Sequence, residues 1–152
     1  MNLTNEEVLE LVPQQEPFRF IDKIHHIDDT IIRASFTFRS DMDFYRGHFP
    51  GNPITPGVIL IEAAAQMSVV SHGIWLVAKE CERKEQISEY TTLFSSVDIA
   101  EFVKPVLPGD TVTVEAKLLL WKRRKIKHEV IMKNQDGITV MNCVFSGFGV
   151  KK

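Results

Sequence analysis

The chain has 152 residues, a formal net charge of −2 and 44% hydrophobic residues. This length predicts one domain over residues 1–152, and the average composition argues against disorder and against fibrous repeats. The near-neutral charge argues against a general nucleic-acid binder. Two cysteines are too few for a disulfide framework, and they fit a reducing, cytoplasmic environment.

The start of the chain predicts a short helix followed by a β-hairpin. Thr4 and Glu7 have the spacing of a capping box, which predicts a helix over residues 5–11. Two runs rich in β-branched and aromatic residues follow, and the second alternates apolar and polar side chains as a half-buried strand does. The two predicted strands cover residues 18–27 and 30–39, with a turn at 28–29.

A loop of restricted backbone and a long apolar helix come next. Residues 41–55 contain two glycines and two prolines, and Thr55 before Pro56 suits an N-cap before the first helical position. The helix that follows has almost no polar face, so other elements must surround it. It is almost long enough to cross a bilayer, but it contains Glu62, Gln66 and His72. Polar groups at bilayer depth are costly, so we interpret it as a buried helix of a soluble protein, without a targeting signal before it.

The second half of the chain predicts further antiparallel strands. Turn signals precede the second and the fourth of four alternating runs, at 107–110 and 136–137. The predicted strands cover residues 91–104, 111–121, 125–133 and 138–148. In the second of these, the pattern directs inward Val112, Val114, Ala116, Leu118 and Leu120. We therefore predict an α+β fold in which a curved antiparallel sheet wraps one long helix.

Glu62 is the only carboxylate in the apolar helix. Burying an unpartnered carboxylate costs several kcal/mol, so its pKa should rise or the group should border a polar cavity. Gln66 lies one turn later on the same face and can orient Glu62 by a hydrogen bond. The structural alternative is that Glu62 reaches solvent or a cation at the sheet edge.

His48 lies in the restricted loop, just before the helix that carries Glu62. An imidazole and a buried carboxyl group of raised pKa suit a general base and a general acid. Gly57 adds free backbone N–H groups in the first helical turn, which can polarise a carbonyl oxygen. The structural alternative is a solvated loop histidine.

Other chemistries lack their sequence patterns. The adjacent His25 and His26 point to opposite faces of a strand, and the cysteines show no metal-ligand spacing, so we expect no metal site. The chain has neither a nucleophile elbow nor a phosphate-binding loop. One segment is strongly basic, and it is either a solvated hairpin or a dock for an acidic partner. It contains Lys122, Arg123, Arg124, Lys125 and Lys127.

The segment FYRGHFPGNPITPGVILIEAAAQ, residues 44–66, resembles the signature of bacterial 3-hydroxyacyl-acyl-carrier-protein dehydratases of the hotdog fold. The fourteen-residue step from His48 to Glu62 matches the catalytic pair of that family. Residues 12–24 resemble its N-terminal motif and residues 94–119 its later strands. The resemblance thus covers nearly the whole chain.

The resemblance implies a hotdog homodimer with shared active sites at the interface, often assembled into a trimer of dimers. It implies that His48 abstracts the C2 proton, that Glu62 helps the 3-hydroxyl leave as water, and that the Gly57 amide holds the thioester carbonyl. No metal or redox cofactor is implied, because the elimination changes no oxidation state. The substrate would be carried on the phosphopantetheine of an acyl carrier protein. The acidic carrier favours the docking interpretation of the basic segment 122–127.

Three positions depart from the family pattern. Gln14 and Gln15 stand where the family has His-Arg, and Leu93 stands where it has a tyrosine at the tunnel mouth. These changes predict an altered chain-length preference or a specialised acyl chain such as a polyene. A glutamate at 62, rather than aspartate, resembles the branch that dehydrates without isomerising. The alternatives are a hotdog thioesterase and a non-catalytic subunit that binds acyl carrier protein.

Overall fold

The computed structural model describes residues 1–152 as six strands and a set of helices. In chain order the elements are α1 (Asn5–Glu10), β1 (Lys23–Ile27), β2 (Ile31–Thr37), η1 (Asp43–Arg46), α2 (Gly57–Ala65), η2 (Gln66–Val70), α3 (Ser71–Glu80), α4 (Lys84–Ser88), β3 (Tyr90–Phe102), β4 (Thr111–Lys122), β5 (Lys125–Lys133) and β6 (Thr139–Lys151). The strands form one antiparallel sheet in the order β1-β2-β4-β5-β6-β3. Strands β1 and β3 are therefore the two edges.

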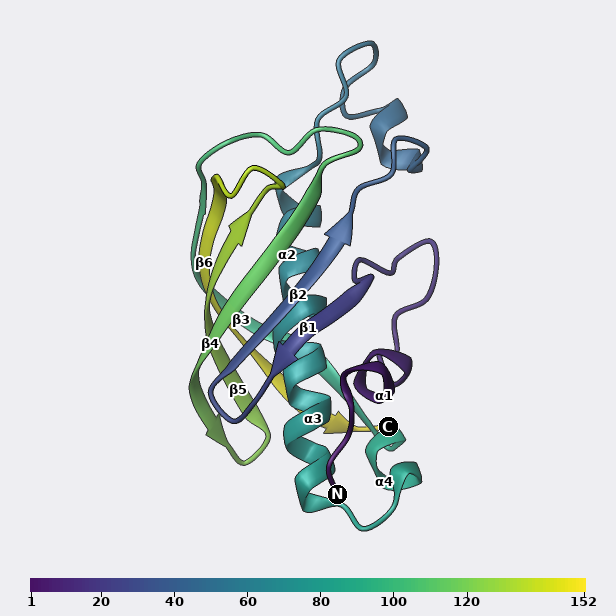
Figure 1. Ribbon diagram of the computed structural model, residues 1–152, viewed down its shortest axis with the longest axis vertical. Coiled ribbons are helices and arrows are strands. Elements are labelled where there is room, and N and C mark those ends of the chain that lie inside the picture. Colours follow the sequence, from purple (N-terminus) through teal and green to yellow (C-terminus); the bar gives the residue numbers. More distant parts are fainter.

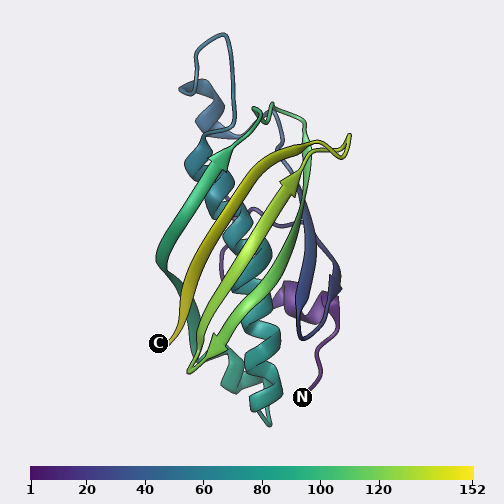
Figure 2. The same ribbon diagram turned by 90° about the vertical axis from the view of Figure 1, so that its left-hand side faces the viewer.

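Helices α2 and α3, joined by the π-helical turn η2, form one continuous helix from Gly57 to Glu80. The sheet curves around this helix, as Figures 1 and 2 show from two sides. The helix is long and apolar enough to cross a membrane, but 72% of its most apolar stretch is buried inside the fold. The predicted hotdog arrangement of a sheet wrapped around a core helix is confirmed.

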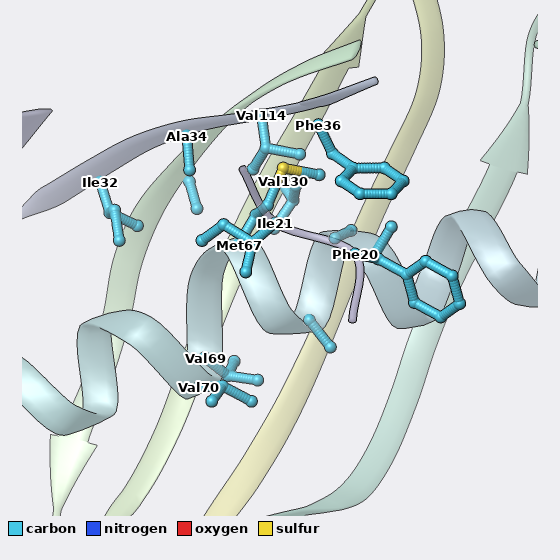
Figure 3. Packing of buried hydrophobic residues seen from close by; sticks show 14 of the residues in the cluster. Phe20, Ile21, Ile32, Ala34, Phe36, Met67, Val69, Val70, Val114 and Val130 are labelled. Atoms are coloured by element: carbon cyan, nitrogen blue, oxygen red, sulfur yellow. The ribbon is translucent and has the colours of Figure 1, made fainter. Parts of the chain in front are cut away.

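The core lies between the long helix and the concave face of the sheet (Figure 3). Phe20, Phe36 and Met67 are among its largest fully buried side chains, and Val114 and Val130 reach it from the central strands. On β2 the inward residues alternate with exposed or half-buried ones, as the sequence predicts. The first helix is also confirmed, because Thr4 and Glu7 form both bonds of the capping box.

The first predicted strand is wrong in its N-terminal half, because residues 18–22 are not part of β1. The side-chain amide of Gln66 accepts from the Phe20 N–H at 2.7 Å and donates to the Phe18 carbonyl at 3.0 Å. A buried side chain on the helix thereby satisfies backbone groups that a neighbouring strand would otherwise bind. The segment is thus held against the helix, and only Asp22 at its end bonds to β2, through its N–H and the Ser35 carbonyl.

The predicted helix start is also wrong, because Thr55 does not cap α2. Its hydroxyl is hydrogen-bonded to the Tyr45 hydroxyl at 2.6 Å, and both residues are buried. Pro56 occupies the N-cap position with extended backbone and no side-chain cap bond. The helix therefore begins at Gly57, and the Gly57 N–H has no hydrogen-bond partner in the chain.

The predicted inward direction of Leu120 is wrong as well. A register shift between Leu118 and Leu120 interrupts the pairing of β4 with β5. The extra residue of such a bulge reverses the alternation of faces. Leu120 is consequently exposed, and Trp121 packs against the core instead. The charged segment before β3 contains the short helix α4, whose Ile87 is buried.

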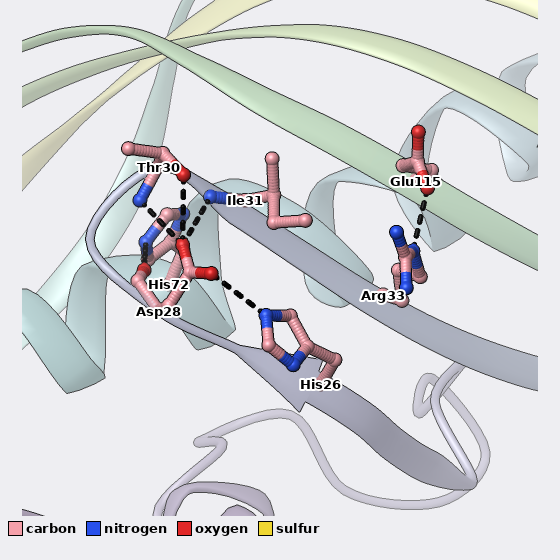
Figure 4. Close-up of polar contacts among 7 residues, drawn as sticks. All are labelled: His26, Asp28, Thr30, Ile31, Arg33, His72 and Glu115. Atoms are coloured by element: carbon pink, nitrogen blue, oxygen red, sulfur yellow. Dashed lines mark hydrogen bonds and ion pairs between the residues drawn. The ribbon is translucent and has the colours of Figure 1, made fainter.

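Two histidines are fully buried between the long helix and the sheet. His72 Nε2 donates to the Asp28 carbonyl oxygen at 2.8 Å (Figure 4), which leaves His72 Nδ1 to accept from His128 Nε2 at 2.8 Å. The Asp28 side chain meanwhile binds the Thr30 and Ile31 N–H groups and forms the β1–β2 turn. Burial lowers the pKa of His72 to about 4 and, together with the neighbouring His72, that of His128 to about 3.

This neutral pair predicts a loss of stability in mild acid. The unfolded chain binds protons below about pH 6.5, whereas both folded histidines resist protonation until about pH 4, so stability falls across that window. Between pH 7 and pH 5 we expect the pair to account for about 3–4 kcal/mol of lost unfolding free energy. Urea unfolding at fixed protein concentration measures it. A His72→Leu/His128→Leu variant should show a shallower pH dependence, whereas a variant of the exposed His25 should keep the wild-type slope.

Candidate active site

The loop before α2 fixes the ring of His48 through two contacts with Ile54. The Ile54 N–H donates to the His48 carbonyl oxygen at 2.9 Å, and the Ile54 carbonyl lies 2.8 Å from His48 Nδ1. A carbonyl oxygen only accepts, so Nδ1 carries the proton and Nε2 bears the free lone pair. The ring also stacks on Phe49 at 4.2 Å between centroids. The loop thus fixes Nδ1 as the donor and leaves Nε2 without a hydrogen-bond partner in the chain.

A cavity of about 650 Å³ adjoins His48 and the start of α2. Its walls are the loop and first turn of α2 on one side, and the end of β3 with the following segment on the other. Gly57 and Phe102 both line it, and a Cβ atom at residue 57 would lie 2.9 Å from the Phe102 ring. Glycine therefore allows the ring to approach the helix terminus, where the unpaired Gly57 N–H lies. An imidazole acceptor and a peptide donor consequently share one mostly apolar cavity.

Glu62 lies on α2, half-buried, and accepts a hydrogen bond from Gln66 Nε2 at 2.8 Å. Because the Phe20 N–H must face an acceptor, the amide of Gln66 has only one orientation, with Nε2 toward Glu62. Burial raises the pKa of Glu62, although this hydrogen bond partly opposes the rise. The sequence predicts both features: the bond to Gln66 and the direction of the pKa shift.

The protomer does not join His48 to Glu62. Glu62 is not among the residues that line the His48 cavity, and no hydrogen bond connects the two side chains. Gly57 and His48, in contrast, line the same cavity. The contributions of Ile54 and Phe102 were not predicted, since a backbone carbonyl and a distant strand residue leave no local sequence signal.

The basic segment forms the β4–β5 hairpin, and its members differ in environment. Lys122 and Arg123 are exposed, whereas Lys127 pairs with Asp98 at 2.6 Å. Lys125 lies over the Phe148 ring at 5.6 Å. Arg124 turns inward and lies over the Tyr90 ring. The hairpin is therefore not one uniform solvated patch.

The model of the FabA-like domain family matches residues 12–144 of the chain. The 3-hydroxyacyl-[acyl-carrier-protein] dehydratase FabZ of Herpetosiphon aurantiacus is 33% identical over 97% of this chain and 95% of its own length. The bifunctional enzyme LpxC/FabZ of Chlorobaculum tepidum is 41% identical over 74% of this chain. The chain spans only 23% of that longer protein.

A solved structure shares the fold at low sequence identity. The dehydratase heterocomplex ApeI:P of Xenorhabdus doucetiae aligns with a TM-score of 0.74 and 14% identity, over 99% of this chain and 94% of that one. This likeness shows the fold alone. The family match and the relative from Herpetosiphon aurantiacus, a named 3-hydroxyacyl-[acyl-carrier-protein] dehydratase, show more: the chain belongs to the FabA-like family.

Proposed function

We propose that the chain is a 3-hydroxyacyl-acyl-carrier-protein dehydratase, a hydro-lyase that converts the (3R)-3-hydroxyacyl thioester to the trans-2-enoyl thioester and water. One observation carries the mechanism. The Ile54 carbonyl holds the Nδ1 proton of His48, so Nε2 is a ready base inside an apolar cavity next to a free peptide N–H. Proton abstraction beside a thioester carbonyl needs such a base together with a hydrogen-bond donor for the carbonyl oxygen.

His48 Nε2 removes the proton from C2 of the substrate, and the electron pair left on C2 delocalises toward the thioester carbonyl. The Gly57 N–H, at the positive end of α2, donates to that carbonyl oxygen and stabilises the developing charge. The electron pair then forms the C2–C3 double bond as the C3–O bond breaks. The cavity wall formed by Phe102 limits water around the anionic oxygen.

Glu62 supplies the proton for the departing hydroxyl. Its raised pKa favours the protonated form, and Gln66 holds one carboxyl oxygen so that the other can face the substrate. The hydroxyl leaves as water, and the proton gained by His48 later returns to Glu62 through solvent. The elimination changes no oxidation state, so the proposed reaction requires no redox cofactor.

The two acid–base groups meet across a homodimer, since one protomer does not join them. Strand β3 is a sheet edge of thirteen residues paired only with β6, and long apolar edges associate with other strands. Five apolar side chains of β3 and the adjacent Val103 are each 43–54% exposed to solvent. The five on β3 are Leu93, Phe94, Val97, Ile99 and Phe102. Pairing of β3 with β3 of a second copy covers them next to the His48 cavity, which Phe102 also lines. Further assembly into a trimer of dimers is compatible with this interface.

The substrate reaches the enzyme on the phosphopantetheine of an acyl carrier protein, in the cytoplasm. The exposed Lys122 and Arg123 on the β4–β5 hairpin, with Lys125 beside them, provide positive charge for an acidic carrier, whereas the predicted Arg124 turns inward. Such charges act mainly on the rate of encounter, so added salt should lower the rate with carrier-bound substrate more than with a pantetheine thioester.

The direct test is a mass-spectrometric assay of 3-hydroxyacyl-carrier substrates of graded chain length. Loss of one water without release of free thiol supports the dehydratase. Free thiol without an enoyl product identifies a hotdog thioesterase instead. Carrier binding without turnover at any chain length identifies a non-catalytic carrier-binding subunit, and both of these outcomes overturn the proposal.

A further inference from the structure

A second cavity, of about 230 Å³, lies at the far end of the long helix from His48. It is enclosed by the end of α1 with the following segment, by α3 and α4, and by the ends of β3, β5 and β6 that meet there. In Figure 1 this is the region near the C-terminus, where α1 and α4 approach α3. The helix walls are apolar, with Val70, Ile74 and Val77 lining the cavity.

Gly73 lies in the wall of this cavity, in the interior of the long helix. A glycine there costs about 1 kcal/mol relative to alanine, so its presence needs a reason. No neighbouring backbone demands it, because a Cβ atom at residue 73 would meet only the Thr92 hydroxyl at an ordinary 3.5 Å. What glycine does provide is open volume beside the strand residues Thr91 and Thr92.

The cavity carries one unusual group, the guanidinium of Arg124. Arg123 and Arg124 form the β4–β5 turn with positive φ angles of 49° and 62°, and the Gly149 N–H donates to the Arg124 carbonyl at 2.9 Å. The guanidinium lies over the Tyr90 ring at 3.7 Å, and its Nη2 is 3.7 Å from a Glu80 carboxylate oxygen. Its Nη1 is buried without any hydrogen-bond partner.

A buried charged donor without an acceptor is costly, and a ligand oxygen in the cavity would satisfy it. Gln15, one of the two residues that depart from the family's His-Arg pattern, also lines this cavity, and Glu10, Ser88 and Lys152 are further polar residues of its wall. The occupant therefore has an apolar body, for the helix face, and an oxygen at the end that meets Arg124.

The position of this cavity relative to Glu62 indicates which molecule would occupy it. The helix advances about 1.5 Å per residue, so Gly73 lies about 16 Å beyond Glu62 along the axis, and the π-helical turn between the two residues rotates Gly73 away from the face of Glu62. An extended chain advances about 1.2 Å per bond, so roughly thirteen bonds cover this distance. Gln66, which binds Glu62, also bonds to the backbone of Phe18 and Phe20. This segment directly follows Pro13 and Gln15, which line the cavity.

We infer that this cavity receives the distal end of the acyl chain, and that Arg124 selects chains that carry an oxygen acceptor at that end. The inference rests on the proposed dehydratase function and names its substrate class: 3-hydroxyacyl chains of about fourteen to sixteen carbons, counted with roughly thirteen bonds beyond C3, with a terminal hydroxyl or carboxylate. A plain methyl terminus leaves Nη1 without a partner.

The test compares pantetheine thioesters of 3-hydroxyhexadecanoate that end in a methyl group, a hydroxyl or a carboxylate. Wild type should favour the oxygenated chains by about 10- to 100-fold in kcat/KM, the range of one charged hydrogen bond. Arg124→Met should lower kcat/KM for the oxygenated chains to that of the methyl-terminated chain in the same variant. Arg123→Met is the matched control, because it changes the exposed neighbour in the same turn and should keep the preference.

A second pair of variants tests the cavity itself. Gly73→Leu should abolish turnover of all sixteen-carbon chains and retain that of 3-hydroxybutyryl thioester, whereas Gly73→Ala should accept both. Binding of hexadecanedioate against hexadecanoate, measured by calorimetry, reports on Arg124 without turnover. If 3-hydroxybutyryl thioester is not dehydrated, the proposed function fails while binding still tests the cavity. If Arg124→Met leaves the preference and the binding ratio unchanged, the inference is wrong.

Discussion

Replacing His48 by alanine is expected to lower the rate of dehydration by about 10²- to 10⁴-fold, the usual contribution of a general base. The physical reason is that no other acceptor lines the cavity at the position of His48 Nε2, whose orientation depends on the bond from Nδ1 to the Ile54 carbonyl. Steady-state kinetics on a 3-hydroxyacyl thioester measure the effect, which should lie in kcat more than in KM.

The fold should survive this change, since His48 is only half-buried and belongs to a loop. Thermal unfolding of the variant checks that expectation. His25→Ala provides the control, because this exposed histidine only contacts Ser35 on the sheet surface and should leave kcat unchanged. A His48→Ala protein that is folded and fully active would remove His48 from the mechanism.

A lysine in place of Ile99 is expected to convert the protein to monomers and to abolish its activity. Ile99 is 50% exposed in the middle of the free edge strand β3, so the substitution hardly affects the protomer itself. In a symmetric β3–β3 pair each lysine would enter an apolar interface beside its copy, where burying unpaired charge is costly. Size-exclusion chromatography with light scattering gives the oligomeric state, and the enzyme assay gives the activity.

Leu119→Lys is the matched control for the edge strand. Leu119 is 45% exposed on β4, at the bulge and away from β3, so its replacement should leave both assembly and activity as they are. An Ile99→Lys protein that remains dimeric would place the interface elsewhere. One that is monomeric and active would show that a single protomer contains a complete site.

The sequence predicts those parts of the fold in which local pattern and tertiary packing agree. The alternation on β2, the capping box of α1 and the apolar helix all follow from local chemistry that the core reinforces. The failures share a cause, which is a side chain or an extra residue that redirects the backbone. Gln66 binds residues 18–20 and keeps them out of the sheet, and a bulge turns Leu120 outward.

The candidate site was predictable to the same extent. A lone glutamate in an apolar helix, with a glutamine one turn later, indicates a buried hydrogen-bonded carboxyl group, and the structure contains it. The proton position on His48 was not predictable, because it depends on a backbone carbonyl of the same loop. The inward direction of Arg124 was not predictable either. Five basic residues within 122–127 are typical of a solvated hairpin, and nothing in the sequence distinguishes Arg124 from the others.

The central claim is that His48 of one copy and Glu62 of another form one catalytic site. It is tested most directly by mixing two inactive variants, His48→Ala and Glu62→Gln, co-expressed with different affinity tags. A mixed dimer contains one site with both groups intact and one with neither, so random pairing should restore about a quarter of the wild-type activity. Activity no greater than the sum of the separate variants, in dimers shown to be mixed, would contradict a site shared between subunits.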